Sequence, residues 1–434
     1  MPENCLYITY SNPQAVYQPG TNVTGVANLD LKEPIKARSL KIIVDGRAYT
    51  HWRVTRSRSV RNNDGTTRTE NYTVPYSATV IYATGETTAW EAARGSKEVL
   101  QPGFYQFPFT FLLPSNCAPS FEGAYGYIRY MVKIELDRPW RFNKTDKKPF
   151  TVIPVFDLNT IPQAAIPLKD VKVKNLGVVL FRHGKVTVEC ELPKTGFVPG
   201  EMVVINARII NDSSKSLVKA HVKLVEHSRY VAFEHGRTFQ HGLFMDNIPN
   251  VYISNRRSLT RKLATGDQQL SIDRNSKGNA QIYLQVPPTV PSFNTCPIIS
   301  VDYDVDIKFE TSATLNSDIE TSCPIIVGTI PVRSVSFTAV PSAPPMDFPS
   351  SSGVIPSAPT MDIPPVASPS APPMETPPPY PESNGATPFP PLPPSYEESI
   401  NGVDGTTMDT ENIEPFAPRY PFYPVQPVTT KKGG

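Results

Sequence analysis

The chain has 434 residues, and its formal charge of +2 is unevenly distributed. Residues 331–434 carry four Lys/Arg and ten Asp/Glu, a net of −6, so residues 1–330 carry the other 38 Lys/Arg and 30 Asp/Glu, a net of +8. A mildly basic body fits either an anionic partner such as membrane phospholipid or an ordinary solvated surface, and its lack of basic stretches interleaved with aromatic residues argues against nucleic acid as a partner.

The body of the chain reads as a series of short β-strands. Its segments are rich in β-branched and aromatic residues, and several alternate apolar and polar residues. Turn residues separate them, and no long stretch keeps the helical apolar period of about 3.6 residues. The pattern predicts an all-β protein of antiparallel sandwiches. The predicted strands lie at 40–46, 72–82, 104–113, 128–136, 184–192, 203–210, 221–227, 279–286 and 301–310.

The body also contains an internal repeat. YQPGTNVTGVANL at 17–29 aligns without gaps on FVPGEMVVINARI at 197–209, with valine and alanine at matching positions after a shared Pro-Gly. Later segments match in the same order and at nearly the same spacing. A repeat of this length indicates two similar domains, which we predict to be immunoglobulin-like β-sandwiches at 1–158 and 159–332.

The remaining residues, 333–434, form a proline-rich tail. Of the 48 prolines in the chain, 26 lie after residue 330. The tail lacks the alternating apolar runs that could bury one face of a strand, so burial cannot offset the conformational entropy lost on folding. We therefore predict a disordered tail with local polyproline II character.

Two Pro-Pro-x-Tyr sequences occur in this tail, PPPY at 377–380 and PPSY at 393–396. WW domains recognise this pattern, because two prolines in polyproline II geometry stack on an aromatic groove and the tyrosine fills a neighbouring pocket. Proline-rich tails produce single matches by chance, but two copies point to a binding function. The predicted WW-binding residues are Pro377, Pro378, Tyr380, Pro393, Pro394 and Tyr396.

The tail also spells Pro-Ser-Ala-Pro three times. This sequence resembles the P(S/T)AP motif that docks on the UEV domain of ESCRT-I, where the Ala-Pro pair enters a shallow apolar pocket. Flanking residues are shared among the copies, so a duplicated passive spacer is the alternative. Several weak sites on one flexible chain would raise the effective concentration for a multivalent partner. The predicted UEV-binding residues are Pro341, Ser342, Ala343, Pro344, Pro356, Ser357, Ala358, Pro359, Pro369, Ser370, Ala371 and Pro372.

Several uninterrupted stretches of the body match the pattern of one protein family. They are LQPGFYQFPFTFLLP (100–114), PSFEGAYGYIRYMVKIELDRPW (119–140), FTVIPVFDLN (150–159), KTGFVPGE (194–201) and NDSS (211–214). Over about residues 5–330 the chain resembles the arrestin fold, in its α-arrestin (arrestin domain-containing) branch. A retromer-subunit relative of the same fold is the alternative. The resemblance implies an adaptor that recruits HECT-type ubiquitin ligases through its Pro-Pro-x-Tyr motifs.

The body offers one candidate binding surface. RVTRSRSVR places Arg53, Arg56, Arg58 and Arg61 on a predicted hairpin loop, where they could contact acidic lipid or phosphate groups, or could simply be solvated. Trp140, which follows Arg-Pro, is expected to cap a sandwich edge rather than to bind a partner.

No constellation of residues indicates catalysis, a metal site or a cofactor. The chain lacks HExxH, GxSxG, Walker and GxGxxG sequences. His227, His235 and His241 cluster in sequence without the carboxylates or cysteines that would complete a metal site. We therefore expect a protein that is not an enzyme and that uses no cofactor.

The cysteines and the first residues indicate the compartment. The five cysteines are scattered and never form CxxC, so we expect reduced thiols. Some α-arrestins engage thioredoxin through a second-domain cysteine, but Cys190, Cys296 and Cys323 lack surroundings that match this use. The N-terminal MPENCLYITY does not resemble a secretory signal, and no window reaches the ~18 consecutive apolar residues of a membrane span.

Taken together, these features predict a cytoplasmic adaptor that is peripheral at the plasma membrane and endosomes. It would bring WW-domain HECT-type E3 ubiquitin ligases and ESCRT-I to membrane receptors as cargo. The expected outcome is ubiquitination, endocytic sorting, protein transport or vesicle budding. The alternative is a trafficking-coat or retromer-like structural protein with a passive tail.

Overall fold

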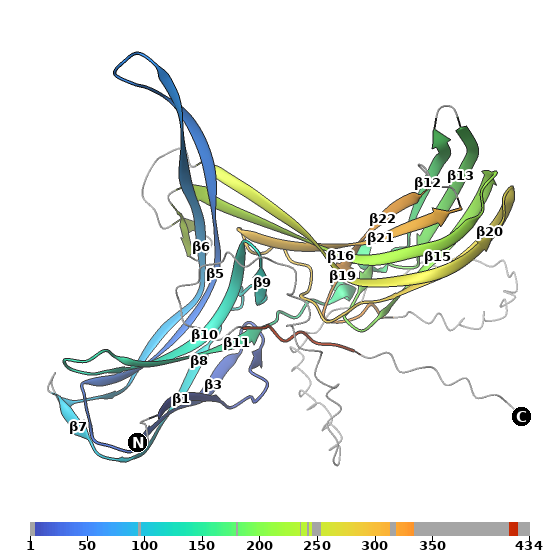
Figure 1. Ribbon diagram of the computed structural model, residues 1–434. Coiled ribbons are helices and arrows are strands. Elements are labelled where there is room, and N and C mark those ends of the chain that lie inside the picture. Colours follow the sequence, from blue (N-terminus) through green and yellow to red (C-terminus); the bar gives the residue numbers. More distant parts are fainter. Residues whose placement is uncertain are drawn as a thin grey trace, which may run out of the picture. The chain divides into compact units, whose positions relative to one another are not determined.

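The computed structural model confirms the all-β prediction. Strands account for nearly all regular structure in the residues that it describes, and the helical pieces are short 3₁₀ turns such as η2 (Leu158–Thr160) and η3 (Pro162–Ala165) (Figure 1). The described residues are 5–93, 97–178, 181–234, 236–240, 243–244, 253–312, 318–333 and 416–423.

The first sandwich packs two sheets face to face. Alternate side chains point inward, so Val23 and Leu29 on one sheet and Ile42 and Ile134 on the other have no exposed surface. One sheet has the order β1-β3-β8 (Cys5–Tyr10, Asn22–Leu31, Gly103–Leu112), and the other contains β6-β5-β10-β11-β2 (Thr67–Glu91, Ser39–Arg61, Gly126–Asp137, Lys144–Val152, Val16–Tyr17). Strand β9 (Phe121–Gly123) pairs with β10, and β4 (Ile35–Ala37) pairs with β7 (Glu98–Leu100).

The second sandwich repeats this two-sheet plan. In β21 (Ile299–Thr311) the burial pattern alternates strictly, as the sequence VDYDVDIKFE predicts for a strand with one face in the core. One sheet has the order β12-β13-β15-β20 (Leu168–Val178, Phe181–Leu192, Met202–Ser213, Ser276–Gln285). The other contains β14-β22-β21-β16 (Gly196–Phe197, Ile319–Val327, Ile299–Thr311, Leu217–Glu234), with β19 (Ser254–Ile272) paired with β16.

The two sandwiches share a sheet. The end of β16 pairs with β6, with Phe233 opposite Ser77 and Glu234 opposite Tyr76. Strand β17 (Thr238–Gln240) runs parallel to β6 beside this point, and it also pairs with β18 (Leu243–Phe244). Backbone hydrogen bonds therefore join the domains directly, a connection that the periodicity of either half alone does not reveal.

The predicted strands at 40–46 and 72–82 are parts of much longer elements. They belong to β5 and β6, which pair from Ser39–Glu91 to Arg61–Thr67, with a shift of register after Leu40 and another after Gly46. Burial alternates along β5 as far as Trp52, and beyond it the side chains are partly or fully exposed. The apolar pattern of the sequence therefore predicted only the buried half of the β5–β6 hairpin, because the solvent-exposed half has no apolar face.

Candidate functional site

The exposed half of β5 and β6 forms a hairpin ribbon that ends in a tight turn. Asn62 donates its backbone N–H to the Thr66 carbonyl at 2.8 Å, and Gly65 adopts a φ of +84°, which is the left-handed region favoured by glycine. The carboxylate of Asp64 accepts hydrogen bonds from the backbone and hydroxyl of Thr66 at 2.9 and 2.6 Å. These bonds hold the pKa of Asp64 below its usual value. The arginines of β5 therefore lie on a defined scaffold, and Figure 1 shows β5 and β6 running together to the tip of the hairpin.

Two of the four arginines that were predicted to contact an anionic surface form ion pairs within the protein. Arg56 of the first sandwich forms an ion pair at 3.2 Å with Glu234 of β16, in the second sandwich. Its positive charge therefore stabilises the contact between the domains. Arg58 donates two hydrogen bonds to one carboxylate oxygen of Glu70, at 2.9 and 3.0 Å. Pairs of this kind contribute little stability at an exposed surface, but they reduce the positive charge that a partner meets.

The other two predicted arginines are exposed. Arg53 and Arg61 make no ion pair within the described part of the chain, and they lie on the same face of β5, separated by roughly 26 Å along the strand. Arg68 of β6 is also exposed near the tip. The sequence reasoning missed Arg68, because only the strand register shows that it lies opposite Val60. The tip thus carries dispersed positive charge rather than a single anion pocket.

The turn between β10 and β11 differs from its prediction. Trp140 was expected to cap a sandwich edge, but its side chain is 95% exposed, and Phe142 is 94% exposed. The expectation is wrong because the turn extends beyond the last paired residues of the ladder, Leu136 and Lys144, where no neighbouring strand covers it.

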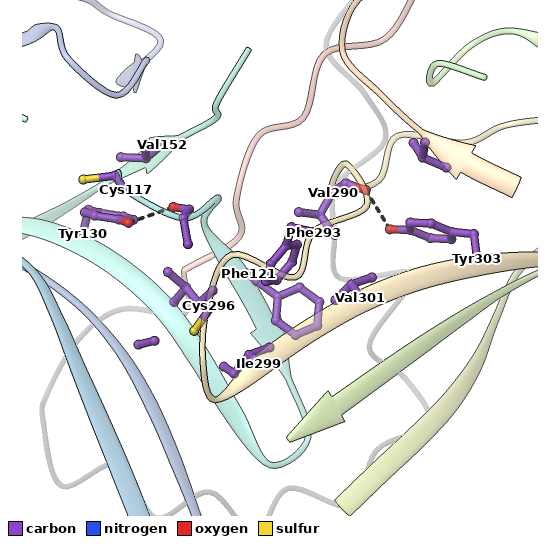
Figure 2. Packing of buried hydrophobic residues seen from close by; sticks show 14 of the residues in the cluster. Cys117, Phe121, Tyr130, Val152, Val290, Phe293, Cys296, Ile299, Val301 and Tyr303 are labelled. Carbon is purple, nitrogen blue, oxygen red and sulfur yellow. Dashed lines mark hydrogen bonds between the residues drawn. The ribbon is translucent and has the colours of Figure 1, made fainter. Parts of the chain in front are cut away.

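The domain junction is built from aromatic side chains of both sandwiches. Phe121 of the first packs edge-to-face on Phe293 of the second, with ring centroids 6.0 Å apart, and Figure 2 shows the two rings between the flanking strands. Tyr230 leaves no room for a side chain at Gly123, because a Cβ there would lie 2.0 Å from the tyrosine hydroxyl. Trp52 adds a hydrogen bond from its indole to Asn255 at 2.9 Å. The core is consequently continuous from one sandwich to the other.

A segment near the C-terminus lies against this junction. Arg419 donates its backbone N–H to Thr151 Oγ1 at 3.1 Å, and the Tyr420 hydroxyl donates to the Ser120 carbonyl at 3.0 Å, both in the first sandwich. Tyr423 then reaches the second sandwich. The prediction of an unpacked tail is therefore wrong for residues 416–423, which contact both domains.

The contact between this segment and the second sandwich requires glycine at position 200. Tyr423 donates its backbone N–H to the Pro199 carbonyl at 3.0 Å and its hydroxyl to the Thr329 carbonyl at 3.0 Å. The backbone of Tyr423 passes so close to Gly200 that a Cβ there would lie 2.0 Å from its carbonyl oxygen. Gly200 has a φ of +95°, so both its conformation and its surroundings require glycine.

A cavity of about 230 Å³ lies beside this segment and is lined in part by Phe121, Tyr420 and a buried ion pair. Glu226, only 2% exposed, accepts a hydrogen bond from Arg261 at 3.0 Å. Burial raises the pKa of Glu226, and the adjacent guanidinium opposes that shift. An ion pair held this deep is costly to break, so it fixes the register of β16 against β19.

The thiols and histidines show no reactive arrangement in the described residues. Burial raises the pKa of Cys117 to about 11 and that of Cys190 to about 12, which disfavours the reactive thiolate. The ring nitrogens of His227 lie 3.1 Å from Thr260 Oγ1 and from Asp304 Oδ2. His235 and His241 lie outside the described residues. No group of three potential metal ligands occurs within the described ranges, and no helix there is long and apolar enough to cross a membrane.

The predicted WW-binding and UEV-binding residues all lie between 341 and 396, outside the described residues. In the sequence this stretch follows Arg333, the last described residue after the second sandwich. It precedes residues 416–423, the docked segment, which contacts both sandwiches.

Comparison with known proteins identifies the two sandwiches. Residues 6–159 match the N-terminal domain of arrestin (or S-antigen), and residues 182–332 match its C-terminal domain. Arrestin domain-containing protein 17 of Caenorhabditis elegans is 28% identical over 331 residues, 75% of this chain and 71% of the relative. Arrestin domain-containing protein 4 of Homo sapiens is 28% identical over 316 residues, 73% and 68% of the two chains. Arrestin domain-containing protein 1 of Rattus norvegicus is 25% identical over 356 residues, 78% and 71% of the two chains. With both arrestin domains matched in order and relatives of this kind, the chain belongs to the arrestin family, in its α-arrestin branch.

Proposed function

We propose that this chain is a non-enzymatic trafficking adaptor, working in the cytoplasm at the inner face of the plasma membrane and endosomes. Its Pro-Pro-x-Tyr motifs bind the WW domains of HECT-type E3 ubiquitin ligases, and its Pro-Ser-Ala-Pro motifs bind the UEV subunit of ESCRT-I. The arrestin body holds membrane receptors as cargo. The outcome is ubiquitination of the cargo with endocytic sorting, protein transport or budding of vesicles from the plasma membrane.

One observation supports this proposal above the others. Two copies of one docking motif and three of another share a single tail attached to an arrestin body. Each short motif binds weakly by itself, because few side chains are buried. Copies on one chain raise the effective concentration of the next site by avidity, which suits the recruitment of large multidomain machines.

The hairpin ribbon of β5 and β6 supports the proposal that the arrestin body binds cargo. Arg53 and Arg61 project from a ribbon with no ion-pair partner among the described residues. Their spacing suits an extended anionic segment, such as a phosphorylated or acidic receptor tail, better than one compact phosphate group. The ribbon is rooted at the domain junction, so cargo bound there would contact the same element that joins the sandwiches.

The UEV part of the proposal can be tested on the full chain. Changing Ala343, Ala358 and Ala371 together to leucine places a branched side chain where the pocket accepts only a methyl group. We expect the triple variant to lose UEV binding in isothermal titration calorimetry, and each single variant to lower the number of UEV domains bound per chain.

The control is the same substitution outside the motifs. Ala386→Leu lies in the same tail and should leave UEV binding unchanged. If the triple variant binds UEV domains with the stoichiometry and affinity of the wild type, the repeats are spacers and the trafficking-coat alternative gains support.

A further inference from the structure

The turn between β10 and β11 presents two aromatic rings to solvent. Trp140 and Phe142 are the most exposed large hydrophobic side chains of the described residues, at 95% and 94%. Isolated exposed apolar residues are common, but two fully exposed aromatic rings within three residues of one turn are an unusual concentration. The fold gains no burial energy from them, so their presence at this position calls for a partner.

The backbone of the turn is strained at one of these two residues. Trp140 adopts a φ of +62°, a left-handed conformation that bulky residues rarely occupy and that glycine or asparagine would adopt more readily. Strain retained at a residue without packing contacts points to a role outside the fold.

Hydrogen bonds hold the turn in this conformation. The Arg138 guanidinium donates to the Phe142 carbonyl at 2.9 Å, and the Arg138 backbone N–H donates to the Asn143 side chain at 3.3 Å. Asn143 in turn donates to Glu135 of β10 at 2.6 Å. The backbone that carries the two rings is therefore ordered before any partner binds, which lowers the entropic cost of binding.

The charge around the rings is positive. The turn and its flanks read RPWRFNK, so residues 138–144 contain three cations and no acid. Three carboxylates flank the turn. Asp137 pairs with Arg38 at 2.7 Å, Glu135 pairs with Lys133 at 2.6 Å, and Asp146 accepts the backbone N–H of Ile8 at 3.1 Å. Aromatic rings surrounded by arginine and lysine match the interface of an anionic bilayer, where tryptophan sits at the headgroup level and cations meet acidic lipid.

We propose that the 138–144 turn is a membrane-contact site that inserts Trp140 and Phe142 into the interface of a bilayer containing acidic phospholipid. The hairpin ribbon of β5 and β6, which carries Arg53 and Arg61, is not part of this site. Asp137 pairs with Ser39 at the start of β5, whereas Arg53 lies 14 residues further along that strand, on the order of 46 Å of contour away. The site would orient the first sandwich on the membrane and leave the hairpin for cargo.

Tryptophan fluorescence makes the site directly testable, because the chain has three tryptophans and only one is highly exposed. The full chain is mixed with vesicles of phosphatidylcholine and phosphatidylserine whose acyl chains are brominated. We expect quenching of the wild type, and none in Trp140→Phe, which keeps an aromatic ring and should still cosediment with the vesicles. Vesicles of phosphatidylcholine alone should bind much less of either protein.

Removing both rings should abolish most of the binding. The variant Trp140→Ser with Phe142→Ser is expected to cosediment roughly tenfold or more weakly, because the cations alone hold it. The matched control is Leu112→Ser. Leu112 is another apolar residue with an exposed side chain, at 68%, and it is the last residue of β8. Leu112→Ser and Arg53→Ala with Arg61→Ala should bind vesicles like the wild type.

Several results would overturn the proposal. They are absence of vesicle binding by the wild type, equal binding to vesicles without acidic lipid, quenching that persists in Trp140→Phe, or wild-type binding by the double serine variant. If the double serine variant instead changes only self-association in sedimentation velocity, the turn is a protein contact. The site is independent of the tail, so Tyr380→Ala with Tyr396→Ala should leave vesicle binding intact.

Discussion

Changing Tyr380 and Tyr396 together to alanine is expected to eliminate binding of the chain to tandem WW domains from HECT-type ligases. The tyrosine of each motif fills one of the two pockets that a WW domain offers, and the remaining prolines cannot replace its ring and hydroxyl. Each single variant should retain binding through the other motif, weakened by about 10² or more because avidity is lost. Surface plasmon resonance with the full chain measures both effects.

The tail provides a matched control for this experiment. Tyr420 is a tyrosine of the same tail, but it lies in the docked segment and its hydroxyl donates to Ser120 rather than belonging to a Pro-Pro-x-Tyr motif. Tyr420→Ala should bind WW domains like the wild type. Normal binding by the Tyr380/Tyr396 variant would show that other tail sequences recruit the ligase, and the proposed role of the motifs would be wrong.

The second large effect concerns the junction between the sandwiches. Phe121→Ala should lower the free energy of unfolding by about 3–5 kcal/mol, because it removes a buried ring and enlarges the cavity beside it. Phe121 is 1% exposed and contacts Phe293 across the junction. Urea denaturation followed by circular dichroism measures the change, and the continuous core predicts one cooperative transition for both sandwiches.

Phe104→Ala is the control for this prediction, since Phe104 of β8 is 55% exposed. Its substitution should change the free energy of unfolding by about 0.5 kcal/mol or less. If Phe121→Ala is equally mild, the contact between Phe121 and Phe293 does not couple the domains. Two separate unfolding transitions would show that the sandwiches fold as separate units.

Much of the fold could be predicted from local patterns. Alternating residues such as those of VDYDVDIKFE determine both the strand and its buried face, and the repeat at 17–29 and 197–209 reveals the duplicated sandwich. The docking motifs are also local, since a WW or UEV domain reads only a few consecutive residues.

The remaining features depend on contacts between residues far apart in the chain. The sequence FAPRYPFY (416–423) is like the rest of a proline-rich tail. This segment is held in place by hydrogen bonds that it donates to the carbonyls of Ser120, Pro199 and Thr329. The register that places Arg68 opposite Val60 is likewise invisible in the sequence. Trp140 was misassigned because an aromatic residue in a β-rich body is usually buried, and only the end of the β10–β11 ladder shows that nothing covers it.

The docked segment changes how the tail should be regarded. Because residues 416–423 contact both sandwiches, the motif-bearing stretch is attached to the body at its two ends rather than at one. A coat protein with a passive spacer would have no need for the motifs themselves, and their loss would leave its assembly unchanged.

A bridging experiment examines whether one molecule of this protein connects a ubiquitin ligase to ESCRT-I. Immobilised WW domains are loaded with the full chain, washed, and then exposed to isolated UEV domain. We expect UEV domain to be retained only when the chain is present, and to be lost with either the Tyr380/Tyr396 variant or the Ala343/Ala358/Ala371 variant. If the wild-type chain fails to retain UEV domain on the WW surface, the protein does not act as an adaptor between the two machineries.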